Sequence, residues 1–282
     1  MPTQGTATAR ASEDRVQTAL ELRAQGRRVE ALDLLSRPGD YAQDVYILRG
    51  DLQLELGRVH EALGSYSTVI TLDRGNTYAQ QKLAICLRQL EKWEPAAETL
   101  RKILAQDSYC DSARIALGGC LLHLKRPEDA LACFEACWSE GAFLASLFGK
   151  AVALQLLERR EQAEAMYHRL LDYAPDSEEA LSNLIALCMQ QYALNRVQRY
   201  AEQLIGLRPD SVIALRALVA TALERREYES AAGYFERLQE HVPENDVSSA
   251  GGNQPVQYLL RKQDLARLTG REARQWAESG SR

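Results

Sequence analysis

The sequence predicts an all-α protein built as a solenoid of tandem helix-turn-helix repeats with a C-terminal helical tail. One observation is a small residue that recurs every 31 to 34 positions, a period typical of one two-helix unit copied in tandem. A second is that larger apolar residues follow it by four and then by seven positions, which places all three on one helix face. The recurring column reads Ala31, Ala62, Ala96, Ala130, Ala163, Val197 and Ala231.

The repeats can be placed in order along the chain. We expect a disordered segment at 1–11, a shortened repeat at 12–42, and then six full repeats. Each full repeat has two helices, and the second carries the residue of the alanine column. The first carries its own small residue in four of the six repeats: Gly50, Ala84, Gly118 and Ala151. The ranges of the full repeats are 43–76, 77–110, 111–143, 144–177, 178–211 and 212–245. Prolines such as Pro175 stop one helix and begin the next repeat.

Two repeats depart from the pattern. The repeat at 111–143 lacks the terminal proline, and we expect Ser139-Glu140-Gly141 to provide its turn. In the repeat at 178–211, Ile185 stands in the small slot of the first helix and Ala201 in the large slot of the second. This exchange predicts that the two residues pack together and conserve volume.

The combination of leucine-glycine, alanine, an aromatic residue and a terminal proline over 34 residues resembles the tetratricopeptide repeat family. The clearest copy lies at 48–74, with Gly50, Gly57, Ala62 and Tyr66. The resemblance spans most of the chain. It implies a right-handed superhelix in which the first helices line a concave groove.

Carried over by repeat position, the resemblance implies that this groove binds a protein or peptide partner. Its middle is apolar, and contiguous exposed apolar residues mark a binding surface. The alternative is that some of these side chains pack between adjacent helices. The expected groove residues are Tyr78, Gln81, Ile85, Arg88, Ile115, Gly119, Leu122, Phe148, Val152, Ser182, Met189 and Arg216. The lysine and asparagine clamp of co-chaperones that grip heat-shock proteins is absent, because other residues occupy its positions: Ile47, Asp51, Gln81 and Ile85.

The C-terminal segment has its own organisation. Residues 246–254 are expected to form a flexible linker, and 255–278 a helical cap or tail that begins at Pro255. Residues 246–282 hold six Lys or Arg and four Asp or Glu, so their charge is opposite to that of the acidic remainder. Two interpretations stay open: the helix caps the solenoid, or it docks into a groove of this chain or of a partner.

Composition limits the possible partners and chemistry. The net charge of −5 disfavours nonspecific binding to nucleic acid phosphates. Residues 1–10 lack the apolar core of a secretory signal, and no apolar run reaches membrane-spanning length, so we expect a cytoplasmic protein without membrane insertion. Cys133 and Cys137 are expected one turn apart on one helix, but the ligands that a metal site needs do not converge. No metal, cofactor or catalytic residue is expected.

These observations favour a non-enzymatic scaffold or adaptor that binds a helix or an extended segment in its groove. Two alternatives remain: a chaperone or assembly factor for a specific client, and a substrate-recognition subunit of an enzyme complex.

Overall fold

The computed structural model of the 282-residue chain describes residues 4–36 and 42–241, with side chains from Glu13 onward. Within these residues every regular element is a helix, which confirms the predicted all-α fold. The linker expected at 246–254 and the helix expected at 255–278 lie outside the described residues. The chain divides into an N-terminal half, Met1–Ala153, and a C-terminal half, Leu154–Arg282, and each is described by itself.

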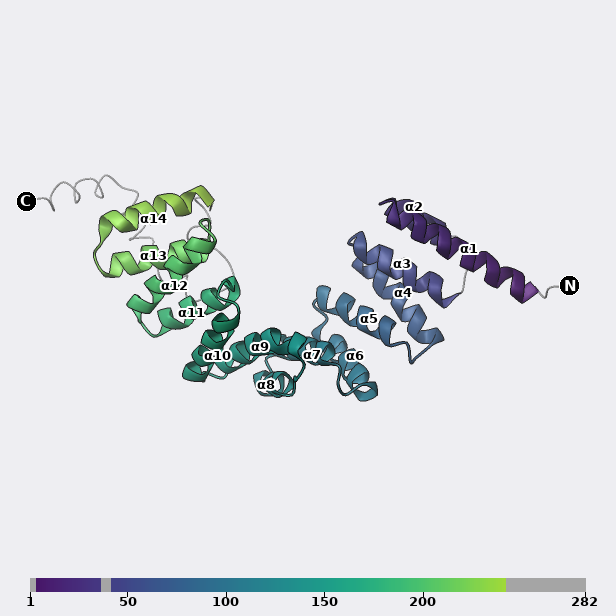
Figure 1. Cartoon of the computed structure of the whole chain (residues 1–282), viewed down its shortest axis with the longest axis horizontal. Coiled ribbons are helices and arrows are strands. Elements are labelled where there is room, and N and C mark those ends of the chain that lie inside the picture. The colour runs from purple at the N-terminus through teal and green to yellow at the C-terminus, as the bar shows by residue number, and fades with distance from the viewer. Residues whose placement is uncertain (1–3, 37–41, 242–282) are drawn as a thin grey trace, which may run out of the picture. The chain divides into compact units, whose positions relative to one another are not determined.

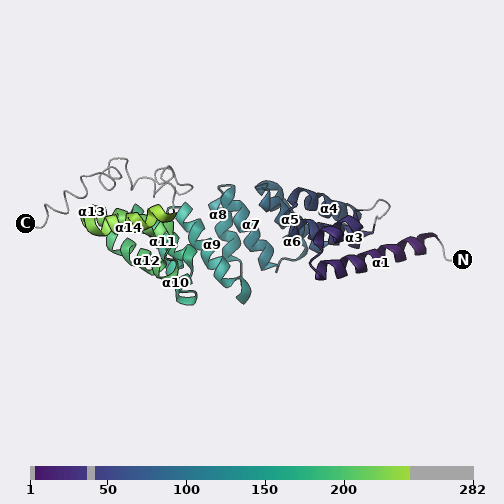
Figure 2. The same ribbon diagram turned by 90° about the horizontal axis from the view of Figure 1, so that it is seen from above.

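Helices follow one another in pairs joined by short turns (Figure 1), and Figure 2 shows the same succession from above. The N-terminal half contains α1 (Gln4–Ala24), α2 (Arg28–Leu35), α3 (Gln43–Glu55), α4 (Val59–Leu72), α5 (Thr77–Gln89), α6 (Trp93–Gln106), α7 (Asp111–His123), α8 (Pro127–Glu135), the short 3-10 helix η1 (Glu140–Ala142) and most of α9 (Phe143–Leu156). The C-terminal half contains α10 (Arg160–Tyr173), α11 (Glu178–Gln190), α12 (Leu194–Leu207), α13 (Val212–Glu224) and α14 (Tyr228–His241). The first helix already begins at Gln4, within the segment for which disorder is expected from the sequence.

The recurring small residues form the packing seam of the repeats. All seven residues of the alanine column are 0% exposed. In two repeats a glycine on the first helix lies directly against an aromatic ring on the second. A Cβ atom at Gly50 would lie 2.7 Å from Cζ of Tyr66, and one at Gly118 would lie 2.6 Å from Cζ of Phe134. The ring therefore occupies the space that a side chain would need, which explains the glycine.

The turns between the two helices of a repeat share one backbone conformation. In each such turn one residue has a positive φ, between 53° and 78°. This left-handed residue ends the first helix in the manner of a Schellman motif, as where the Arg58 amide donates to the Gln53 carbonyl at 2.7 Å. The conformation favours glycine, yet only two of the seven positions are glycines, Gly26 and Gly57. The other five carry a side chain: Glu91, Lys125, Glu158, Tyr192 and Arg226.

One helix is shorter than the sequence predicts. α8 ends at Glu135, so the expectation that Cys133 and Cys137 share a helix is wrong. Asp111, only 5% exposed at the start of α7, accepts hydrogen bonds from the backbone amides of Trp138 at 3.1 Å and Ser139 at 2.7 Å. These bonds hold the chain in an extended path after α8. The turn expected at residues 139–141 is formed by η1.

Asp111 is charged although it is buried. Burial alone would raise the pKa of its carboxyl group, but the amide hydrogen bonds and the ion pair with Arg114 outweigh burial and lower it. The repeat at 111–143 thus forms its final turn with the help of this carboxylate and without a terminal proline.

Candidate partner-binding site

Nine of the twelve predicted groove residues lie on three first helices of the N-terminal half. We call this set the first-helix face. It consists of Tyr78, Gln81, Ile85 and Arg88 on α5, Ile115, Gly119 and Leu122 on α7, and Phe148 and Val152 on α9. All nine are exposed or half-buried, and Ile115 and Leu122 also pack against the core of α5–α8. Tyr78 and Ile85 are the most open large apolar residues of the set, at 42% and 39% exposure.

The structure brings three of these residues together around a hollow. Ile85 and Arg88 from α5 and Gly119 from α7 line a cavity of about 290 Å³. The other lining residues are Gln89, Trp93 and His123. Gly119 leaves the hollow open, because a Cβ atom placed there would have no neighbour within 4 Å. The helical backbone is therefore accessible at this point.

One wall of the hollow is a stacked pair of rings that the sequence does not predict. The rings of Trp93, the first residue of α6, and His123, the last residue of α7, are parallel with centroids 3.8 Å apart. They are 30 positions apart in the chain, but α6 and α7 pack side by side. The repeat indicates that the start of a second helix lies beside the end of the next first helix, but it does not indicate which side chains meet there. His123 read alone looks like an ordinary surface residue.

The charge of the hollow comes from Arg88. This exposed guanidinium forms no ion pair with any residue in the described part of the chain, and it lies beside the apolar Ile85. Arginine can bind a carboxylate or a carbonyl oxygen through several N–H groups at once. The hollow thus combines an apolar wall, an aromatic face and a cation.

Tyr78 is fixed in place by its neighbours. Its hydroxyl donates to both carboxylate oxygens of Asp51, at 2.8 Å each, and the Tyr66 hydroxyl donates to the same carboxylate at 2.6 Å. The ammonium of Lys82 lies 5.2 Å from the centre of the Tyr78 ring and 4.0 Å from Asp51. Burial, then the hydrogen bond and charge of Asp51, raise the pKa of Tyr78 to about 12. The phenol stays neutral, and its exposed ring is held in one orientation.

The remaining three predicted residues belong to the C-terminal half. Ser182 on α11 is half-buried, while Met189 on α11 and Arg216 on α13 are buried, at 9% and 7% exposure. They do not line the hollow of the N-terminal half. The sequence pattern misses the burial of Met189 and Arg216, because α11 is buried at every position from Leu184 to Met189 and α13 at every position from Ala214 to Ala222. Neither stretch has the exposed stripe of a surface helix.

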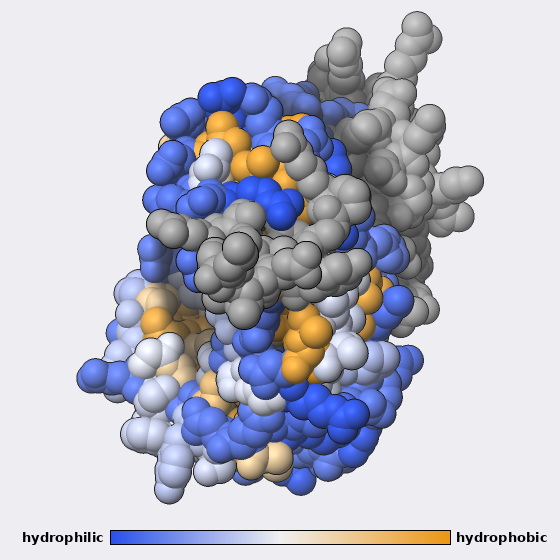
Figure 3. All heavy atoms as spheres, turned by 90° about the vertical axis from the view of Figure 1, so that its right-hand side faces the viewer, coloured by the Kyte–Doolittle hydropathy of each residue, from blue (hydrophilic) through white to orange (hydrophobic). Residues whose placement is uncertain are grey.

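Within the described residues, no three His, Cys, Asp or Glu side chains gather closely enough to hold a metal ion. No helix of the described part has both the length and the apolar character needed to cross a bilayer. The face seen in Figure 3 is mostly hydrophilic, with hydrophobic residues in small separate patches.

Comparison with known proteins agrees with this architecture. Two family models described as tetratricopeptide repeat match the chain, one at residues 47–109, 82–137 and 194–246, the other at 145–177. No curated protein matches it significantly.

Solved structures with the same fold share little sequence with the chain. A tetratricopeptide repeat protein from Parabacteroides merdae superposes with a TM-score of 0.67 at 17% identity, over 89% of this chain and 98% of that one. PilW, described as a type IV pilus biogenesis factor, superposes with a TM-score of 0.64 at 18% identity, over 73% of this chain and 96% of that one. PilF from Pseudomonas aeruginosa superposes with a TM-score of 0.60 at 18% identity, over 72% of this chain and 92% of that one.

At these identities the structures show the fold alone, whereas the family assignment rests on the sequence models. The first model covers more than half of the residues, and its matches fall on the helix pairs described above. The alanine column that predicts the repeat is fully buried in every pair. The chain belongs to the tetratricopeptide repeat family.

Proposed function

We propose that this protein is a non-enzymatic scaffold or adaptor that binds a helix or an extended segment of a partner protein on its first-helix face. Proteins of the tetratricopeptide repeat family generally mediate protein–protein interactions. The observation that carries the proposal is the hollow between α5 and α7, where exposed apolar, aromatic and cationic groups surround a glycine.

The openness of the hollow supports a peptide rather than a small molecule. Pockets for small molecules enclose most of the ligand's surface, whereas this hollow of about 290 Å³ is open to solvent. It suits one or two side chains of a peptide. We expect an apolar side chain to enter between Ile85 and the ring of Trp93, over Gly119. Arg88 and Gln89 would then bind a carboxylate or a backbone carbonyl of the same segment.

The fixed ring of Tyr78 supports binding with little reorganisation. Ordering a free side chain at an interface costs about 0.5–1.5 kcal/mol, and the two hydrogen bonds to Asp51 have already ordered this one. Tyr78 therefore acts as a ready contact, and Asp51 acts as its positioning residue.

Peptides selected from a random display library against the purified full chain provide the test. Each selected peptide is titrated into ¹⁵N-labelled protein, and the indole N–H resonances of Trp93 and Trp138 are followed. Trp93→Phe and Trp138→Phe are used for assignment, because the chain has a third tryptophan, Trp276. We expect the Trp93 resonance to shift. Trp138 is the internal control, because it is 67% exposed and pairs edge-on with Tyr109 outside the hollow. Peptides that move Trp138 and leave Trp93 unchanged would contradict the proposal.

A further inference from the structure

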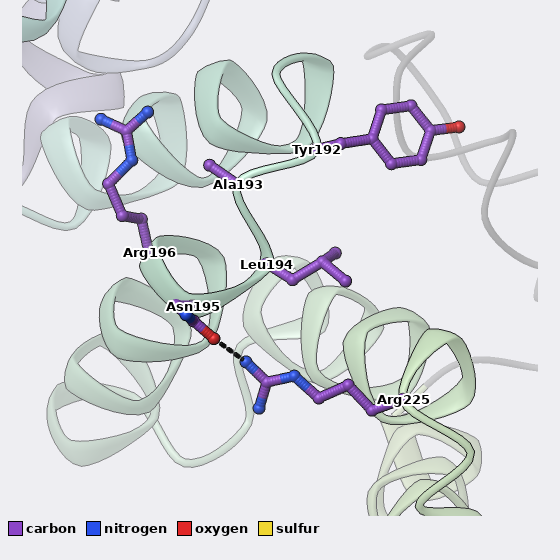
Figure 4. A pocket seen from close by; sticks show the side chains of 6 residues that line it. All are labelled: Tyr192, Ala193, Leu194, Asn195, Arg196 and Arg225. Carbon is purple, nitrogen blue, oxygen red and sulfur yellow. Dashed lines mark hydrogen bonds between the residues drawn. The ribbon is translucent and has the colours of Figure 1, made fainter.

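A second hollow lies in the C-terminal half, at the turn between α11 and α12. It measures about 420 Å³ and is lined by Tyr192, Ala193, Leu194, Asn195, Arg196 and Arg225. Arg225 comes from the end of α13, in the next repeat, and extends toward Asn195 (Figure 4). None of its lining residues belongs to the first-helix face, so this hollow is independent of the site proposed above.

The two arginines of this hollow are in different electrostatic states. Arg196 forms an ion pair with Glu164, so its charge is neutralised, and in Figure 4 its guanidinium points away from Tyr192 and Leu194. Arg225 instead donates to the amide oxygens of Asn195 and Gln198. Both acceptors are neutral. They orient the guanidinium without cancelling its charge, and among the described residues no carboxylate forms an ion pair with Arg225.

Tyr192 gives the second observation. It occupies the left-handed position of its turn, with φ 53°, and its side chain is 79% exposed. The six equivalent positions carry glycine or a charged residue. A large aromatic side chain in this conformation is unfavourable both for the backbone and for the exposed ring. Such an unfavourable residue beside an oriented cation indicates that the ring contacts something in solution.

We propose that this hollow binds an acidic segment of a partner protein. Arg225 binds a glutamate or aspartate carboxylate, and Tyr192 and Leu194 contact the apolar residue next to it. The arrangement fits a peptide better than a nucleic acid, because the hollow offers a single oriented cation rather than a basic patch and the chain as a whole carries a charge of −5. Because Asn195 and Gln198 already hold the guanidinium, little side-chain entropy is lost on binding.

The test uses two fluorescein-labelled peptides and the full-length protein. In the first peptide glutamate alternates with leucine and phenylalanine, and in the second glutamine replaces each glutamate. Fluorescence polarisation should show that the wild type binds the glutamate peptide about tenfold or more tightly, as expected for one charge-assisted contact. In a Gly119→Gln background, where the hollow of the N-terminal half is filled, Arg225→Gln should abolish this preference. Arg226→Gln is the matched control, since it removes the same charge one residue away, and it should retain the preference.

Two further variants keep the test decisive. Tyr192→Gly should raise the melting temperature, because glycine suits the turn, and yet weaken binding of the glutamate peptide. Gly119→Gln by itself fills the hollow of the N-terminal half and should leave the glutamate preference that depends on Arg225 in place, which separates this proposal from the proposed function. Equal losses in Arg225→Gln and Arg226→Gln, no difference between the two peptides, or displacement of the peptide by an oligothymidine would overturn the proposal.

Discussion

Gly118 and Gly119 are adjacent in α7, and the structure predicts opposite effects when each is changed to alanine. Both lie in the helix, so each substitution gains about 1 kcal/mol of helix propensity. A Cβ atom at Gly119 would meet nothing within 4 Å. We therefore expect Gly119→Ala to stabilise the protein by about 1 kcal/mol.

The Cβ atom of Gly118→Ala would enter the ring of Phe134. It would lie 2.6, 2.7 and 3.0 Å from the ring atoms Cζ, Cε1 and Cε2, where ordinary contacts are 3.4–4 Å. The ring cannot retreat freely, because Phe134 is 2% exposed and also lies against the backbone of Gly149, where a Cβ atom would come within 2.4 Å. Overpacking of this kind costs about 1–3 kcal/mol. The propensity gain is common to both variants, so Gly118→Ala should be less stable than Gly119→Ala by this amount.

Urea denaturation followed by circular dichroism measures the difference as a shift in midpoint at constant slope. A double-mutant cycle with Phe134→Leu is the second measurement. Phe134→Leu should destabilise the Gly118→Ala variant less than it destabilises the wild type, with a coupling energy of about 0.5–3 kcal/mol. The natural counterpart is the repeat with Ile185 and Ala201, both buried, where the large and small residues are exchanged. If the two alanine variants shift the midpoint alike and show no coupling to Phe134, the packing account is wrong.

Three further outcomes follow from the titrating groups. Asp111→Ala should lower the free energy of unfolding at pH 7 by about 2–4 kcal/mol. Because the pKa of Asp111 is lower in the folded than in the unfolded protein, its stabilising contribution is present above the unfolded pKa of about 3.9 and is lost as pH falls through the folded pKa. The unfolding free energies of the variant and the wild type should therefore converge when both are measured at decreasing pH. In a spectrophotometric titration at 295 nm, Tyr78→Phe should remove a phenol that ionises near pH 12, and loss of a component near pH 10 instead would show that Asp51 does not hold the hydroxyl. Burial raises the pKa of Cys86 to about 11 and raises those of Cys120 and Cys188, so these three buried thiols should resist Ellman's reagent at pH 8 until the protein is unfolded.

The packing seam was predictable because it repeats. Ala96 and Ala130 occupy the same environment in successive repeats, so the need for a small residue there appears as a period in the sequence itself. The exchange of Ile185 and Ala201 follows from the same regularity. The early end of α8 does not, because it depends on Asp111 reaching the amides of residues 27 and 28 positions away.

The candidate site was predictable only in part. Ile85, Arg88 and Gly119 follow from repeat position, and the structure brings them together. The ring pair of Trp93 and His123 occurs once, between two repeats, so no periodicity indicates it. A residue that differs from its counterparts in the other repeats cannot be predicted from the repeat period. The Trp93–His123 pair is such a case, and it also distinguishes this hollow from the rest of the first-helix face.

The most direct test of binding at the first-helix face is to fill its hollow without weakening the fold. Gly119→Gln places a side chain in the hollow, while Gly64→Gln is the matched control on α4, where a Cβ atom also has no neighbour within 4 Å. Both changes replace a helical glycine and should raise stability by a similar amount.

Isothermal titration calorimetry then compares the two variants with a peptide selected on the wild-type chain. We expect Gly119→Gln to weaken binding about tenfold or more, a loss of about 1.4 kcal/mol or greater, while Gly64→Gln binds like the wild type. Equal affinity of the two variants for the peptide would contradict the claim that the hollow beside Trp93 and Gly119 is the binding site.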